Sequence, residues 1–233
     1  MPTKRRNYNP WEIPNYTVEE GSRYLHVAET VLRYWIVGRS GAGRSGAAPL
    51  TSVYSWNPLL LSFKNLVELY VLESLRNTHG IGIRSIRRDV EELRREKPSK
   101  YPLADYQLAT RGRRIYLEGD GDELVNLSAG GQQAFKQILT PFLKRVDRNT
   151  KGIAERLFPF TQAKYQKSPM NAPQIVVIDP TIAFGKPVLV NSRISTSFLL
   201  SRKLGGATIA RLAADYGRSE EEISEAIHLE EAA

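Results

Sequence analysis

The sequence predicts a mainly α-helical protein with small β elements, an α+β chain built in three parts. Apolar residues recur at helical spacing through most of the chain, whereas strand-like alternation is confined to a few short segments. The 233 residues, 41% of them hydrophobic, are enough for two compact units and the structure that connects them. We therefore expect an N-terminal unit over residues 1–97, a bridge and linker over residues 98–173, and a C-terminal unit over residues 174–233.

Charge is distributed unevenly along the chain, which has a formal net charge of +8. Residues 1–115 hold 19 Lys and Arg against 11 Asp and Glu, whereas residues 168–233 hold 6 against 8. A basic first half favours a polyanionic partner, and an acidic end favours a protein partner.

Several classes of protein are disfavoured by what the sequence lacks. Without cysteine, the chain has no disulfides, thiolate zinc sites or cysteine nucleophiles. The charged start is not followed by the apolar run of a secretory signal, and no stretch approaches the roughly 20 apolar residues that span a bilayer. We therefore expect a cytoplasmic protein with no membrane partner, no metal and no cofactor.

The first elements predicted are two short helices joined by a tight turn. Thr17 and Glu20 form a capping box that begins the first helix, and the small Gly21 and Ser22 allow a second helix to approach closely. That second helix is predicted from Ala28 to Ile36. Val27, Val31 and Trp35 give it one inward face. The pair is typical of a helix-turn-helix, whose second helix enters the major groove of DNA.

A basic, glycine-rich loop over residues 38–46 follows, and then a predicted strand from Leu50 to Trp56. The loop and strand together suit a wing that lies on the phosphate backbone. Two further helices are predicted, from Phe63 to Arg76 and from Ile83 to Glu96. Within the loop, the three glycines at 41, 43 and 46 match G-x-G-x-x-G, but no helix begins there to hold a pyrophosphate, so a basic loop is favoured.

The run from Val27 to Trp35 resembles the recognition helix of the MerR and excisionase type, V-S-x-x-T-[LV]-R-Y-[YW]. With the wing and the two following helices, residues 15–97 resemble a whole MerR-like winged helix-turn-helix module. The resemblance implies a DNA-binding surface with contacts in the major groove, on flanking phosphates and from an N-terminal arm. The residues expected to make these contacts are, in that order, Glu29, Thr30, Arg33 and Tyr34; Arg39 and Arg44; and Lys4, Arg5 and Arg6.

The middle segment shows no chemistry of its own. Residues from Gln107 to Leu117 and from Glu123 to Leu127 alternate as a hairpin whose turn is residues 118–122. A helix from Gln132 to Val146 and a polar, proline-punctuated linker from Gln162 to Pro173 complete it. We interpret this segment as a structural bridge or a dimerisation surface.

The C-terminal unit is predicted as two short strands, residues 175–178 and 188–190, and a three-helix bundle. The helices are expected from Thr196 to Leu204, from Thr208 to Tyr216 and from Glu220 to Leu229. Ser219 with Glu222 forms a second capping box.

Along these elements the order Asp179-Pro180, Gly185-Lys186-Pro187, Arg193-Ile194, Gly206, Tyr216 and Ser219 resembles a small antitoxin domain found beside PIN-type ribonuclease toxins. The family pattern begins D-P-x(4)-G-K-P-x-[IVL]-x-G-T-R-I, and Asn191-Ser192 here replaces its Gly-Thr. With the MerR-like unit, the whole chain resembles the longer VapB-type antitoxins of type II toxin–antitoxin pairs.

That resemblance implies a homodimer that binds operator DNA, represses its own operon and neutralises a PIN-type ribonuclease toxin. It would associate with the nucleoid through the operator. The toxin would contact Lys186, Arg193 and Tyr216. The alternative interpretation of Lys186 and Arg193 is a β-turn and a salt bridge that serve only folding.

No catalytic residues are expected, and we predict that the protein is not an enzyme. His26, His79 and His228 are scattered over three elements, and no catalytic or P-loop motif is present. Two alternatives to the antitoxin remain open. One is a stand-alone MerR-like transcription regulator with a C-terminal ligand or dimerisation module. The other is a structural or adaptor protein whose basic face is only a solvated surface.

Overall fold

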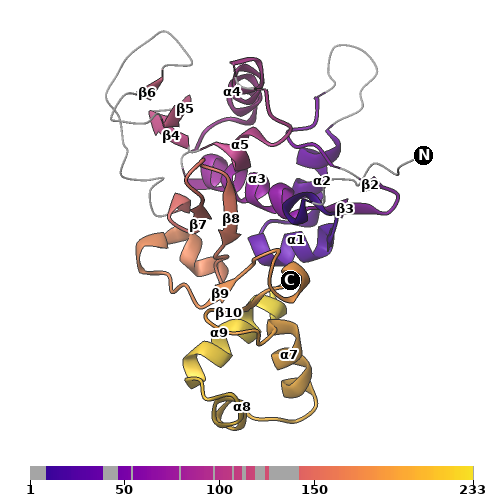
Figure 1. Ribbon diagram of the computed structural model, residues 1–233, viewed down its shortest axis with the longest axis vertical. Helices are drawn as coiled ribbons and strands as arrows, with labels where there is room; N and C mark the ends of the chain where they lie inside the picture. Colours follow the sequence, from indigo (N-terminus) through magenta and orange to yellow (C-terminus); the bar gives the residue numbers. More distant parts are fainter. Residues whose placement is uncertain are drawn as a thin grey trace, which may run out of the picture.

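The computed structural model describes residues 9–38, 47–53, 55–78, 80–96, 98–106, 108–111, 114–118, 124–125 and 142–232. The N-terminal helices lie in the middle of the molecule, α4 (Ile83–Glu96) at one end and the C-terminal helices at the other (Figure 1). The sheets have two or three antiparallel strands each. The predicted class, mainly α with small β elements, is therefore confirmed.

The two helices of the predicted helix-turn-helix are α1 (Val18–Leu25) and α2 (Glu29–Val37). The capping box of Thr17 and Glu20 is present, as predicted. A Cβ on Gly21 would lie 3.0 Å from Leu61 and 3.6 Å from Leu32 of α2. The small residue therefore does allow the close approach that the sequence indicated.

The predicted wing strand from Leu50 to Trp56 was largely wrong. Only its end forms β2 (Ser55–Trp56), which pairs with β3 (Leu59–Leu61) after a cis Asn57–Pro58 bond. β3 also pairs with β1 (Tyr16–Thr17), giving a three-stranded sheet in the order β1-β3-β2. A three-residue strand beside a proline carries too little alternation to be seen in sequence.

Helix α3 (Phe63–Glu73) is buried on all sides and continues as a π-helical segment, Ser74–Thr78. Helix α4 begins and ends as predicted, and Ile86, Val90 and Leu93 face inward. A short helix, α5 (Pro102–Asp105), packs against α3. The N-terminal segment Pro10–Glu12, a 3-10 helix, also contacts α3.

The middle segment differs from its prediction in two places. Residues 107–117 are not one strand but two, β4 (Leu108–Arg111) and β5 (Arg114–Glu118), and β5 also pairs with β6 (Leu124–Val125). Val146 lies in β7 (Val146–Arg148), not in a helix, and β7 pairs with β8 (Ala154–Leu157). The predicted helix before residue 142 lies outside the described residues.

The predicted linker is held to the core by one buried side chain. The Arg145 guanidinium donates to the carbonyls of Phe158 (2.8 Å), Pro159 (3.0 Å), Ala172 (3.1 Å) and Pro173 (2.9 Å). Short 3-10 helices, Ala163–Lys167 and Pro169–Asn171, occupy the stretch. Two of these carbonyls, those of Ala172 and Pro173, lie in the predicted linker, so the end of the linker is bonded to the buried cation.

The C-terminal unit closely follows its prediction. Strands β9 (Val176–Val177) and β10 (Val188–Leu189) pair antiparallel. Helices α7 (Thr196–Leu204), α8 (Ile209–Tyr216) and α9 (Glu220–Glu231) follow, and α9 starts at the capping box of Ser219 and Glu222.

One hydrophobic cluster runs from the N-terminal helices into the C-terminal unit. It includes Tyr16 and Leu25 at one end and Leu199, Ile223 and Leu229 at the other. Helix α9 packs against α1, beside which the C-terminus lies (Figure 1). The division of the chain at residues 97 and 173 stays a prediction, but the N-terminal and C-terminal parts share a core.

Among the helices that the structure describes, none combines the length and the apolar sequence that a membrane span requires.

Candidate functional site

Helix α2 presents one exposed face beside a buried one. Leu32, Trp35 and Ile36 are buried, whereas Thr30 and Arg33 lie on the exposed side. This division follows from the 3.6-residue period of the helix. The exposed side therefore has the space that a nucleic-acid groove would need.

Arg33 forms an ion pair within its own helix. Its Nη2 lies 2.6 Å from Oε1 of Glu29, one turn earlier, and both side chains are about half exposed. An exposed pair at this spacing contributes only about 0.3–0.5 kcal/mol. Arg33 can therefore exchange Glu29 for a phosphate or base at little cost.

Tyr34 lies toward α4, not with Arg33. Its hydroxyl accepts from Arg87 Nη1 at 3.1 Å, and the Arg87 guanidinium lies 5.1 Å from the centre of its ring. Arg87 also donates to the carbonyl of Ala48 at 3.0 Å. The two residues thus join α2, α4 and the segment that follows the basic loop.

The other predicted DNA contacts lie outside the described residues. They are Lys4, Arg5, Arg6, Arg39 and Arg44. Their roles stay predictions.

The turn between α1 and α2 is tied to the middle segment. His26 ends α1 in a left-handed conformation, and its Nε2 lies 2.7 Å from the carbonyl oxygen of Phe160. Burial lowers the pKa of His26. Gln166 donates to the carbonyl of Leu25 at 2.9 Å. The turn between α1 and α2 is therefore bonded to Phe160 and Gln166 of the middle segment.

The Gly185-Lys186-Pro187 motif docks on the N-terminal unit. Lys186 Nζ lies 2.7 Å from Glu20 Oε1 and 3.2 Å from the carbonyl oxygen of Asn15. The buried Tyr16 hydroxyl donates to the Gly185 carbonyl at 2.7 Å. Burial raises the pKa of Tyr16, so its hydroxyl stays protonated and can donate to the Gly185 carbonyl. Lys186, expected to contact a toxin, is engaged within its own chain.

Beside the motif is a turn in an unfavourable backbone conformation. Ala183, Phe184 and Gly185 have successive φ values of 47°, 54° and 77°. A left-handed conformation costs a non-glycine residue roughly 1–2 kcal/mol. The turn nevertheless places the Phe184 side chain in solvent, 91% exposed.

Arg193 is exposed and lines a surface pocket of about 430 Å³. Arg156 lies on the same pocket, where its Nε is 3.1 Å from Asp179 Oδ2. In the part of the chain that the structure describes, Arg193 makes no ion pair. Its charge is therefore available to an anionic or aromatic group.

Tyr216, the third predicted toxin contact, ends α8 and is half buried. Its hydroxyl accepts from Arg202 Nη1 at 3.0 Å, and its ring meets Phe198 edge-on at 6.3 Å between centroids. Phe198 is 49% exposed. Tyr216 therefore joins α8 to α7 and borders an exposed aromatic side chain.

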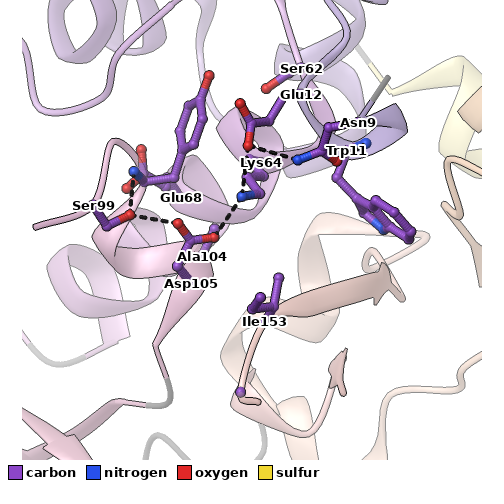
Figure 2. Close-up of polar contacts among 12 residues, drawn as sticks. Asn9, Trp11, Glu12, Ser62, Lys64, Glu68, Ser99, Ala104, Asp105 and Ile153 are labelled. Carbon is purple, nitrogen blue, oxygen red and sulfur yellow. Dashed lines mark hydrogen bonds and ion pairs between the residues drawn. The ribbon is translucent and has the colours of Figure 1, made fainter. Parts of the chain in front are cut away.

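Sequence reasoning missed several buried charged groups. Figure 2 shows Lys64 between Glu12 and Asp105, with its Nζ 3.0 Å and 2.9 Å from their carboxylates. Lys64 pairs with one oxygen of each carboxylate, so the cluster joins the 3-10 helix Pro10–Glu12, α3 and α5. No sequence signal marks it, because charged residues usually lie on the surface.

Glu68, on the same helix as Lys64, is fully buried. It accepts from Leu103 N at 3.2 Å and from the Thr51 hydroxyl. Burial raises its pKa to about 7. Among the described residues, no group of three or more His, Cys, Asp or Glu could hold a metal ion.

The chain is similar to a protein family, to a curated protein and to a solved structure. Residues 176–229 match the family described as "Protein of unknown function (DUF433)". Over 235 residues the chain is 26% identical to a Mycobacterium tuberculosis protein described as "Putative antitoxin VapB45", covering 93% of this chain and 94% of that one. The fold is similar to the crystal structure of Rv2018 from Mycobacterium tuberculosis, with a TM-score of 0.59 and 19% identity, covering 94% of this chain and 99% of that one.

Over nearly its whole length the chain is thus similar to a protein described as an antitoxin. The segment that matches the family of unknown function contains the docked motif at Lys186, the pocket residue Arg193 and Tyr216.

Proposed function

We propose that this chain is an antitoxin of a type II toxin–antitoxin pair. It binds operator DNA as a cytoplasmic homodimer, represses its own operon and neutralises a PIN-type ribonuclease toxin. The observation that carries the proposal is the similarity, over nearly the whole chain, to a protein described as an antitoxin. The basic first half and the acidic end support the division between a DNA partner and a protein partner.

The DNA-binding half of the proposal is supported by the exposed face of α2. Thr30 and Arg33 are exposed, and the Glu29–Arg33 pair is weak enough to open. Tyr34 is better placed to fix α2 against α4 than to enter the groove, because Arg87 holds its hydroxyl. Arg33 is therefore the residue whose loss should matter most for binding.

The toxin-binding half is supported by Arg193 and Tyr216 more than by Lys186. Arg193 is exposed and unpaired within the described residues, and Tyr216 borders the exposed Phe198. Lys186 would first have to leave Glu20. The pocket at Arg193 also favours the second candidate, a stand-alone transcription regulator with a C-terminal ligand or dimerisation module.

Co-expression of the tagged full chain with its neighbouring open reading frame tests the toxin half. We expect a stoichiometric partner that is toxic alone and silent in the complex. If no partner copurifies while the chain still binds its upstream DNA, the stand-alone regulator is the better interpretation.

Operator binding is tested by titrating the upstream DNA at several salt concentrations. Arg33→Ala should weaken binding by about 1–3 kcal/mol if the residue reads a base. Arg211→Ala is the matched control, since Arg211 forms a similar exposed pair with Asp215 (2.8 Å) on α8. Equal affinities for Arg33→Ala and the unmodified chain would overturn the placement of α2 on DNA.

A further inference from the structure

Phe184 is an exposed aromatic residue on a turn that cannot easily relax. The turn is closed by backbone hydrogen bonds from Gly185 to Ile182 (2.8 Å) and from Lys186 to Ala183 (3.1 Å). The Asn15 amide also donates to the Phe184 carbonyl, and Tyr16 holds Gly185. Strained backbone persists only where its surroundings enforce it, and it gathers at functional sites.

Such a turn presents the ring at low entropic cost. The backbone under Phe184 is already ordered, so a partner that binds the ring need not order the loop. Aromatic side chains on rigid elements are the common anchors of protein interfaces. An anchor of this kind requires an apolar pocket of matching size on its partner.

The same turn forms the wall of such a pocket. Ile182 lines the cavity of about 430 Å³, together with Phe158, Val177 and Val190. Ala183, directly before Phe184, packs on the same small apolar cluster. The cavity therefore has these four apolar side chains in its lining, beside the polar Asp179, Asn191 and Ser192, and it lies next to the turn that carries the exposed ring.

The lining of this pocket also includes Arg156, which is paired with Asp179 at 3.1 Å, and Arg193. The Arg156 side chain is 53% exposed, and Arg193 is exposed as well. Guanidinium groups are attracted to the face of an aromatic ring. A cavity whose lining combines four apolar side chains with two arginines can therefore accept a phenylalanine ring.

We propose that two copies of this chain associate through this turn, with Phe184 of each inserted into the pocket of the other. A two-fold interface requires a patch that complements itself, and here the anchor Phe184 lies two residues after Ile182, which lines the pocket. This inference rests on the homodimer of the proposed function and adds the surface through which the two copies associate. The association itself needs neither DNA nor toxin.

Sedimentation of the full chain alone, across a range of concentrations, tests the proposal. Phe184→Ala removes the anchor and leaves the pocket, whereas Val190→Trp fills the pocket and leaves the anchor. Each should raise the dissociation constant of the dimer at least about tenfold, since both symmetric contacts are lost at once. Leu204→Ala, which removes an apolar side chain that is 77% exposed on α7, is the matched control and should leave the dimer unchanged.

Mixing the two variants provides the sharper test. A heterodimer of Phe184→Ala with Val190→Trp keeps one intact insertion, whereas each variant alone keeps none. We expect the mixed species to form more tightly than either homodimer. A monomeric unmodified chain at about 100 µM, or a dimer that neither variant weakens, would overturn the proposal. Because no DNA or toxin is present, failure here is distinct from failure of the antitoxin assignment.

Discussion

The ammonium nitrogen of Lys186 lies 2.7 Å from Oε1 of Glu20, a residue 166 positions earlier in the chain. The other oxygen of that carboxylate accepts from the Thr17 backbone amide at 3.0 Å and so caps α1. One carboxylate thus both caps the start of α1 and binds Lys186 of the C-terminal unit. The motif at residues 185–187 therefore has a structural role within the chain.

Loss of this pair should destabilise the fold modestly. Lys186→Ala removes a partly exposed ion pair, so we expect the free energy of unfolding to fall by no more than about 1 kcal/mol. Lys203→Ala, which removes the more exposed pair with Glu231, is the control and should cost less. Urea unfolding measures both. If Lys186→Ala leaves the free energy of unfolding unchanged but abolishes toxin binding, Lys186 is instead a contact to the partner.

Gly185 should tolerate no side chain. A Cβ there would lie 2.5 Å from the Tyr16 hydroxyl, and the residue has a φ of 77°. Gly185→Ala should therefore lower stability by roughly 1–3 kcal/mol and shift the turn that carries Phe184. Gly206→Ala is the control, because Gly206 also has a positive φ (96°) but has open space around it. Similar thermal shifts for both variants would show that backbone strain alone, without the clash, accounts for the cost.

Stability should fall as the pH rises toward neutrality, because of Glu68. Its pKa is about 7 in the folded chain and near the ordinary 4.5 in the unfolded chain. The folded state therefore binds the proton of Glu68 more tightly than the unfolded state does. The stabilisation that results is fully present below about pH 4.5 and is lost as the pH rises to about 7. At about 1.4 kcal/mol per pKa unit, the change amounts to a few kcal/mol.

Glu68→Gln isolates that contribution. The amide keeps an acceptor for the Leu103 backbone N–H but cannot ionise. Urea unfolding at about pH 5 and about pH 8 should show a smaller difference in the variant than in the unmodified chain. An unchanged difference would place the pH dependence elsewhere.

Deleting residues 174–233 should damage the remaining chain. The sequence suggests a separable C-terminal unit, but Leu199, Ile223 and Leu229 share a cluster with Tyr16 and Leu25. Removing them exposes apolar surface on α1, so we expect lower thermal stability and increased amide exchange there. A truncated chain as stable as the full one would show that the shared core contributes little. Point variants therefore test the two partners more cleanly than truncation.

Much of the fold was predictable because it is recorded in local patterns. The capping boxes at Thr17 and Ser219 and the periodicity of α4 and α7 depend on residues three or four positions apart. The strands β3 and β8 were not predicted, because three or four residues carry almost no period, whereas β9 and β10 lie within short apolar runs that the sequence shows. The candidate residues of α2 came from the resemblance of the run from Val27 to Trp35 to a MerR-type recognition helix, and their contacts with DNA stay a prediction.

The sequence by itself thus determined the helices, their caps, the basic and acidic halves and the motif order of the C-terminal unit. Only the tertiary structure decided how these are joined: Lys186 on Glu20, Tyr34 on Arg87 and the exposed Phe184 beside its pocket. The physical reason is that each of these depends on groups far apart in the chain. Packing against a distant neighbour decides whether a charge or a ring is buried, paired or presented to solvent, and no local pattern records it.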